Sequence, residues 1–223
     1  MGVLRLYRLG EDGAQGPSVV GELLQLGARA DGEWRARYAI HAPREGQELP
    51  LTVVVLANRS FVMRGSDLLD SEEDTTASTG ETMQQLLQEQ TTDRGVALKP
   101  RQAAAIEGSR YRLGDFVVCV GRATVRGRGR GSVAAVEYLP SNCWSCREDS
   151  DSQVDCATHA ANFGDATGLL NELEGALSGG ESTMRRAAVV PDLTEFSACG
   201  LSLRDWSARH AALLYAMLFR RMT

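Results

Sequence analysis

The sequence lacks the segments that would insert the chain into a membrane or direct it to secretion. No apolar run approaches the roughly 18 residues of a membrane-spanning helix. The opening residues, MGVLRLYRLG, contain no long apolar stretch of the kind that a secretory signal needs. Leu6 stands where a myristoylation signal requires serine or threonine. The five cysteines are an odd number and follow no signal peptide, so we expect a soluble protein of a reducing compartment, the cytosol or the nucleus.

The sequence also has little that points to catalysis. It contains no G-x-S-x-G nucleophile elbow, and His41, His159 and His210 lie in three different contexts without a carboxylate pattern beside them. The glycines of LGEDGAQG do not fit a phosphate-binding loop. The carboxylates of residues 70–74 form a run that is typical of a solvated loop. We therefore expect no enzymatic activity, no cofactor and no small-molecule substrate.

What the chain does have is an ordinary globular composition. Its 223 residues are 43% hydrophobic and 24% charged, which suits a domain with a sizeable core. The formal net charge is −5, which argues against a protein whose main work is coating DNA or RNA. We predict a single domain over residues 1–223, with flexible loops near residues 70–80 and 145–164.

The spacing of apolar residues predicts strands that pair as hairpins, with helices between them. GVLRLYRL alternates apolar residues with arginines and predicts a strand with one wet face. Further strands are expected in WRARYAIHA, in a hairpin over residues 51–63 and on both sides of RGRGRG. SVVGELLQLGARA and DATGLLNELEGALSGG have helical spacing. The acidic stretch DLLDSEEDTTASTG predicts a loop, and Ser78 and Glu81 at its end have the capping-box spacing of a short amphipathic helix.

Two segments predict elements that are covered on all sides. Both faces of the strand expected at residues 116–120 are apolar, which is typical of a strand buried on both sides. The terminal segment LRDWSARHAALLYAMLFRRMT predicts a helix that is apolar almost all round, and such a helix is normally buried. Leu214, Met217 and Leu218 of this helix should be buried inside the chain or face a partner. The order β-α-β-β-β-α-β-β-β-α-α indicates an α+β fold with an antiparallel sheet flanked by helices.

Four residues have the spacing of a small zinc site. Cys143, Cys146, Cys156 and His159 form the pattern C-x2-C-x9-C-x2-H in a polar stretch, and such knuckles can place four ligands around Zn²⁺. The alternative is that they fall by chance in a polar loop. A redox C-x-x-C pair is disfavoured because acidic residues follow Arg147 at once. We assign no metal to the chain and keep a zinc-stabilised interaction module as an alternative.

The tract RGRGRG, residues 126–131, admits two interpretations. Three arginines in an acidic chain could contact nucleic acid, which would make binding salt-dependent. Apolar strand-like segments hold both ends of the tract, and glycine suits the positive φ angles of a connecting turn. We favour a hairpin tip and keep a nucleic-acid-binding protein as the alternative.

The segment around this tract resembles subunit twenty of Mediator, the coactivator that links transcription factors to RNA polymerase II. The resemblance consists of an aromatic residue, a GDF triplet, an apolar strand, a loop that ends in Arg-Gly, and a VEY triplet followed by proline. In this sequence the matching residues are Tyr111, Gly114, Asp115, Phe116, Val136, Glu137, Tyr138 and Pro140. The segment DLTEFSACGLSLRDWSARHAALLYAML is similar to the C-terminal helix region of the family, above all of plant-type sequences. The cysteine-rich stretch after Trp144 and the acidic loop near Glu72 depart from the family pattern.

The resemblance implies an antiparallel β-barrel-like domain flanked by helices, without catalytic residues. It implies a nuclear scaffold protein that pairs with Mediator subunits eighteen and eight in the head module and acts on RNA polymerase II indirectly. The lack of a long apolar run leads us to expect no membrane attachment, and the acidic charge leads us to expect no direct contact with nucleic acid. Most of the chain follows the family layout, and about a third of it does so in specific residues.

Overall fold

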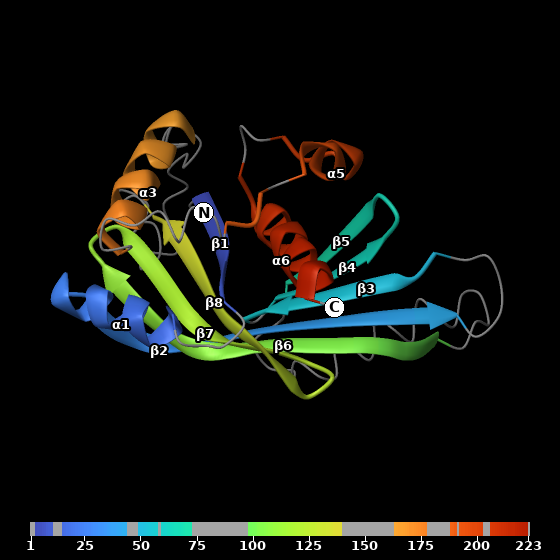
Figure 1. Cartoon of the computed structure of the whole chain (residues 1–223). Coiled ribbons are helices and arrows are strands. Elements are labelled where there is room, and N and C mark those ends of the chain that lie inside the picture. The colour runs from blue at the N-terminus through green and yellow to red at the C-terminus, as the bar shows by residue number, and fades with distance from the viewer. Residues whose placement is uncertain are drawn as a thin grey trace.

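The structure is a computed structural model, and it describes residues 3–10, 15–43, 49–57, 59–72, 98–139, 163–177, 188–190, 192–202 and 206–222. In the described chain all eight strands precede the last three helices, and one helix, α1, lies between the first two strands (Figure 1). The elements are β1 (Val3–Leu9), α1 (Gln15–Gln25), β2 (Arg29–Pro43), β3 (Leu51–Leu56), β4 (Arg59–Arg64), β5 (Asp67–Glu72), β6 (Leu98–Leu113), β7 (Phe116–Val125), β8 (Arg128–Tyr138), α3 (Phe163–Leu177), α5 (Leu193–Ala198) and α6 (Ala208–Met222).

The strands form one eight-stranded sheet in the order β1-β8-β7-β6-β2-β3-β4-β5. Every pairing in it is antiparallel, which confirms the predicted α+β class. In the described part of the chain β1 and β5 are the two ends of the order and do not pair with each other, so the sheet is open and not a closed barrel. Figure 1 shows the sheet curving around α6.

A pair of facing glycines lies within β6 and β7. Gly108 of β6 is the register partner of Gly121 of β7, and a Cβ atom added at Gly108 would stand 2.1 Å from the Val120 carbonyl oxygen. No side chain fits in that space, because two backbones approach each other there. Trp34 of β2 pairs with Gly108 on the other side, so the two glycines lie in the same row of the sheet as a large ring.

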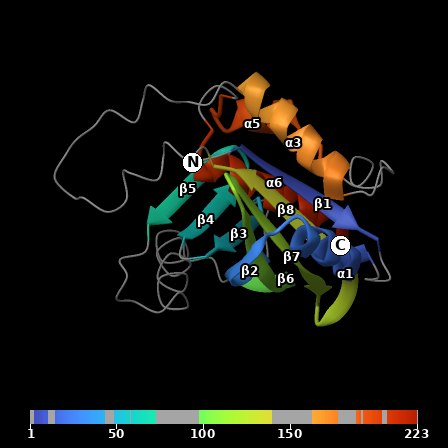
Figure 2. The same cartoon turned by 90° about the vertical axis from the view of Figure 1, so that its left-hand side faces the viewer.

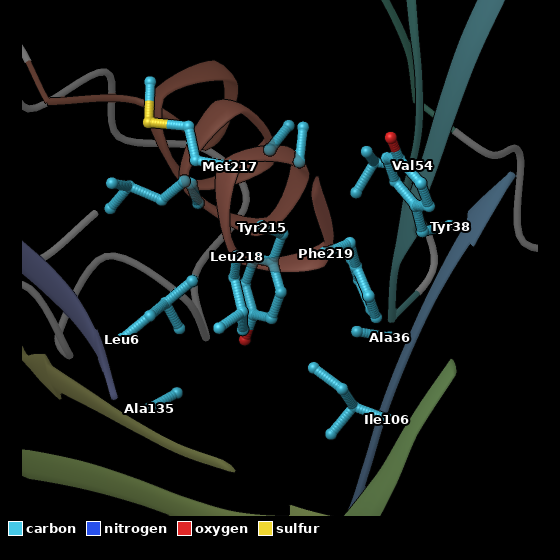
Figure 3. Packing of buried hydrophobic residues seen from close by; sticks show 14 of the residues in the cluster. Leu6, Ala36, Tyr38, Val54, Ile106, Ala135, Tyr215, Met217, Leu218 and Phe219 are labelled. Atoms are coloured by element: carbon cyan, nitrogen blue, oxygen red, sulfur yellow. The ribbon is translucent and has the colours of Figure 1, made fainter. Parts of the chain in front are cut away.

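Helix α6 fills the concave face of the sheet. Its residues from His210 to Phe219 are all buried, and Figure 3 shows Tyr215, Leu218 and Phe219 directed at side chains of the strands. The Phe219 ring stacks on Tyr38 of β2 with ring centroids 5.1 Å apart. The predicted burial of this terminal helix is confirmed, and its own sheet provides the cover.

The opposite face of the sheet is covered at one end by α1 and α3 (Figures 1 and 2). Their buried residues Leu23 and Leu170 join a second core cluster with Val118, Val120 and residues of β1 and β8. Val117 and Cys119, which alternate with these valines, belong instead to the cluster under α6. Strand β7 is therefore buried on both sides, as its apolar faces predict.

Two predicted details are wrong. Strand β1 has no wet face, because Leu4 and Leu6 pack under α6 while Val3 and Tyr7 pack on the side of α3. Asp67–Glu72, predicted as the start of an acidic loop, is strand β5. Its leucines pair with Val62 and Met63 of β4 across a tight turn, and this tertiary pairing outweighs the acidic composition of the segment.

Some predicted elements lie outside the described residues, and one helix of the structure was not predicted. The expected amphipathic helix that begins at Ser78 lies outside the described residues, as do positions 73–80 and 145–162 of the two expected loops. The remaining residues of those loops are ordered: 70–72 belong to β5, and Phe163 and Gly164 open α3. The short helix α5 was not predicted from its spacing. Its N-cap is Asp192, whose carboxylate accepts the Thr194 N–H at 2.9 Å.

Candidate functional site

The residues that carry the family resemblance meet at one corner of the sheet. Gly114 and Asp115 form the two-residue turn between β6 and β7, and Gly114 has φ 57°, which glycine adopts without strain. Phe116 opens β7 and pairs in register with Tyr138, the last residue of β8. The N–H of Leu139 donates to the Asp115 carbonyl at 2.7 Å, so the end of β8 is tied back to the turn.

An aromatic surface results from this arrangement. The Phe116 and Tyr138 rings lie 5.3 Å apart, centroid to centroid, at an interplanar angle of 49°. Tyr111 pairs with Val118, and Val118 pairs with Val136, which aligns these side chains across three strands. The three rings are half-buried and pack against the cluster under α1 and α3. The motif therefore positions strands and presents aromatic edges, and it contains no pair of nucleophile and base.

Of the remaining motif residues, the structure places Glu137. Glu137 pairs with Val117 and with Leu4, both on the α6 side of the sheet. Pro140 lies outside the described residues, so the proline that completes the family pattern is not placed.

The zinc candidates Cys143, Cys146, Cys156 and His159 lie outside the described residues. Within the residues that the structure describes, no group of three or more His, Cys, Asp or Glu side chains could hold a metal ion. Cys119, which is buried, and Cys199, which is half-buried, are free thiols.

The three side chains proposed either for burial or for a partner are buried by the chain itself. Leu214, Met217 and Leu218 are 1%, 5% and 0% exposed. In Figure 3 Leu218 points toward Leu6 of β1, whereas Met217 lies on the side of α6 away from the strands. In this arrangement they offer almost no surface to another protein.

The RGRGRG tract divides into a turn and the start of a strand. Val125 pairs with Arg128, so Arg126 and Gly127 alone form the tip of the hairpin, with φ angles of 51° and 75°. Two consecutive residues with positive φ are the signature of a turn that suits the twist of paired strands. Arg126, Arg128 and Arg130 are exposed. The predicted hairpin tip is confirmed, although it is shorter than the tract.

Gly131 marks a β-bulge just beyond this tip. The register between β7 and β8 shifts between Arg122 and Thr124, and Gly131 has φ 102°, a conformation that favours glycine. The glycine at the end of the tract, which matches the Arg-Gly of the family pattern, is therefore required by the backbone.

A buried charged group joins β1 to α3. Glu174 of α3 is 3% exposed, and one carboxylate oxygen accepts hydrogen bonds from the Arg5 guanidinium and from the Tyr7 hydroxyl. Arg5 also donates to the Asn171 side chain at 2.9 Å. Burial, first, and the neighbouring Glu174 carboxylate, second, raise the pKa of Tyr7 well above its usual value. Sequence reasoning missed this group, because its partners are 169 residues apart along the chain.

His210 is packed among polar backbone and aromatic rings. The Ser207 backbone N–H donates to its Nδ1 at 3.1 Å, and Nε2 lies 3.0 Å from the Ser202 carbonyl oxygen. The Trp206 ring stacks on the imidazole at 4.9 Å, and the Phe196 ring meets it edge-on. With 1% exposure, this histidine connects the start of α6 to α5 and cannot reach a substrate in solvent.

Comparisons with known proteins give a distant structural likeness and no family. No family model matches the sequence, and no curated protein matches it. Among solved structures, the chain is similar to a putative adenylate cyclase from Bacillus halodurans, with 11% identity and a TM-score of 0.43, over 80% of this chain and 90% of that chain. It is similar to a chain of the Schizosaccharomyces pombe Mediator head module, with 10% identity and a TM-score of 0.40, over 79% of this chain and 94% of that chain.

A third similar structure is the S. pombe Pct1 RNA triphosphatase in complex with the Spt5 CTD. The identity there is 8% and the TM-score is 0.33, over 78% of this chain and 76% of that chain. These neighbours differ in what they do, and likenesses at such TM-scores carry no argument about this chain. No helix in the described residues is long and apolar enough to cross a membrane.

Proposed function

We propose that the chain is a non-enzymatic scaffold subunit of the Mediator head, of the subunit-twenty type, that acts in the nucleus in RNA polymerase II transcription. The observation that carries the proposal is the set of motif residues at the corner of β6, β7 and β8. Phe116 and Tyr138, far apart in the motif, are register partners whose rings are in contact distance. The pattern that resembles the family thus corresponds to one structural unit.

The filled concave face supports a scaffold role over catalysis. A curved antiparallel sheet can enclose a ligand only if its interior is open. Here α6 occupies that interior, with Leu214, Tyr215, Leu218 and Phe219 at 5% exposure or less. Binding energy is then available from outer faces, helices and strand edges, which are the surfaces that assembly subunits use.

Affinity purification tests this proposal. The tagged chain is recovered from nuclear extract of the source organism after nuclease treatment, and its partners are identified by mass spectrometry. We expect Mediator head subunits, with subunits eighteen and eight among them. The variant Leu218→Asp, which should not fold, is the control for nonspecific capture and should recover none of them. A chain that is folded by circular dichroism and recovers no Mediator subunit would overturn the proposal.

A further inference from the structure

The two outer strands of the sheet differ in how their free sides are covered. Beside β1, the N–H of Val189 donates to the Leu6 carbonyl at 2.7 Å, and Ala188 forms a bridge with Tyr7. At the other end, β5 pairs with β4 and with no other strand in the described part of the chain. A strand edge carries a row of backbone donors and acceptors that can pair with another chain.

The register of the hairpin identifies which backbone groups of β5 face outward. Arg64 and Asp67 flank the two-residue turn at Gly65 and Ser66. In such a turn the flanking residues form a hydrogen-bonded pair, and pairs alternate from there along the ladder. Leu69 therefore directs its N–H and carbonyl to β4, whereas Leu68 and Asp70 direct theirs to the outer edge.

The surroundings of this edge suit an added strand. A hollow of about 490 Å³ lies beside the start of β5, and its lining is both apolar, with Val62, Leu68, Leu69 and Cys199, and charged, with Arg64 and Asp67. Leu69 is 51% exposed, which leaves apolar surface next to the free backbone groups. Added strands gain affinity from main-chain hydrogen bonds and specificity from side-chain pockets of this kind.

We propose that the outer edge of β5 is a strand-addition site for an extended segment of a partner protein that has a basic and an apolar residue two positions apart. On one face of β5, exposed Asp67 and Leu69 follow each other at that spacing. A basic side chain opposite Asp67 and an apolar one opposite Leu69 would complement this face. Asp70 on the other face already meets Arg59 at 2.6 Å.

A second copy of this chain complements this face poorly. In an antiparallel pair of β5 strands, residues opposite each other lie on the same face, so Asp67 could lie opposite Asp67 or Leu69. β5 has the sequence DLLDSE and contains no basic residue, so no register of two copies places a positive charge opposite Asp67. A partner segment with a basic residue supplies that charge.

Hydrogen exchange with a defined peptide tests the site. The probe is the peptide Lys-Thr-Val-Thr-Lys-Thr-Val-Thr, followed by NMR at the amides of Leu68, Leu69 and Asp70. We expect the amides of Leu68 and Asp70 to exchange readily in the free protein and to be slowed by about tenfold or more in the complex. The Leu69 amide, already paired to β4, serves as the internal reference. The same peptide with N-methylated amides, or with Glu for Lys, should give no such protection.

A matched pair of variants tests the side-chain contribution. Leu69→Lys should weaken peptide binding about tenfold, because the new lysine repels the basic peptide and the apolar contact is lost. Leu24→Lys, on α1 and 54% exposed, should leave peptide affinity unchanged.

Three results would overturn the site: no protection at saturating peptide, protection of Leu68 and Asp70 in the free monomer, or protection that grows with protein concentration alone. The second would show that this chain covers its own edge, and the third that a second copy does. The peptide test does not depend on Mediator, so its failure and the failure of the purification experiment are distinguishable.

Discussion

Part of the sheet is covered on both faces, by α6 on one side and by α1 and α3 on the other, and the two covers differ in chemistry. Under α6 the buried contacts are mainly apolar, and the Trp34 indole N–H donates to the Tyr215 hydroxyl at 3.1 Å. Under α3 the apolar contacts surround a carboxylate, Glu174, that is 3% exposed and paired with Arg5. We call these the α6 face and the α3 face.

The two faces therefore contribute differently: one mainly stabilises the fold, and the other mainly positions a helix. Apolar burial stabilises in proportion to the area removed from water and has little directional preference. A buried ion pair adds little net stability, because desolvation offsets the attraction, but it penalises every arrangement that separates the charges. We infer that the α6 face supplies most of the folding free energy, while the α3 face fixes where α3 lies on β1.

The largest effect is expected on the α6 face. Leu218→Asp would bury a carboxylate in the apolar cluster that contains Leu6 and Ile106. We expect the loss to exceed about 4 kcal/mol and the chain to be largely unfolded, measured by urea denaturation. Leu218→Ala should cost about 2–5 kcal/mol, and Leu24→Glu, at an exposed position, at most about 0.5 kcal/mol. A cooperative, wild-type transition for Leu218→Asp would contradict the assignment of the α6 face as the main core.

The second largest effect is expected from a substitution that breaks the ion pair on the α3 face. Glu174→Ala leaves Arg5 and the Tyr7 hydroxyl without their shared acceptor. We expect a loss of about 3 kcal/mol, at the low end for a broken buried pair, because the Arg5 side chain remains 25% exposed and keeps Asn171. Urea denaturation measures it.

Replacing Arg5, Tyr7 and Glu174 together by apolar residues tests whether the ion pair itself stabilises the fold. The triple variant Arg5→Met, Tyr7→Phe, Glu174→Leu removes all three polar partners and should lie within about 1 kcal/mol of wild type. Chemical-shift changes along α3 should nevertheless be larger than in α6, since the positioning contact is gone. A loss as large as that of Glu174→Ala would show that the pair itself stabilises the fold.

Alkaline pH should weaken both faces, because each buries weak acids whose pKa values are raised, with Cys119 and Tyr215 on the α6 face and Tyr7 on the α3 face. Burial raises the pKa of the Cys119 thiol, on the α6 face, to about 12, and the pKa of Tyr7, on the α3 face, is also raised. Both groups are neutral when folded and ionise first in the unfolded chain, so their contribution is complete below the unfolded pKa values, near 9.0 and 10.0. Stability should then fall as pH rises, by up to about 1.4 kcal/mol per pH unit for each ionising group.

Single substitutions measure how much each face contributes to the fall of the free energy of unfolding with rising pH. Urea denaturation between pH 8 and pH 11 should show a shallower decline for Cys119→Ala and for Tyr7→Phe than for wild type, with the two reductions additive because the sites lie on opposite faces. A slope unchanged in both variants would mean that other groups carry the alkaline sensitivity.

The sequence predicts the α6 face better than the α3 face, for a physical reason. A helix that is apolar all round has only one stable place, inside the molecule, so LLYAMLF suffices to predict its burial. The pairing of Arg5 with Glu174 depends on the tertiary arrangement and leaves no local pattern. Only the unusual placement of a glutamate between Leu173 and Leu177 on an apolar helix face could have drawn attention to it.

The candidate surfaces were predicted unevenly as well. The GDF and VEY triplets were found through the family resemblance, and the structure places them at a turn and at the paired ends of two strands. Strand β5 was missed because its three carboxylates suggested a loop, although Gly65-Ser66 gives the turn signal of a hairpin. Pairing with β4 stabilises β5 as a strand, although its acidic composition does not favour one.

The smallest effect is expected where neither face is involved. Arg126, Arg128 and Arg130 are exposed at the β7–β8 hairpin, and Arg126 contacts the chain through the Arg101 carbonyl at 3.3 Å. Changing all three to serine should alter the free energy of unfolding by no more than about 0.5 kcal/mol. Glycines 127 and 131 stay in place in this variant, so the turn and the bulge keep their backbone conformations.

The same variant tests the nucleic-acid alternative. Fluorescence anisotropy with single- and double-stranded DNA and RNA at low salt should give equal, weak signals for the variant and for wild type, because an acidic chain with three loop arginines presents too little positive charge for a stable phosphate interface. Tight binding by wild type that weakens with salt and disappears in the variant would instead identify the hairpin as the functional surface. In that case the arginines, and not either buried face, would carry the main activity of the molecule.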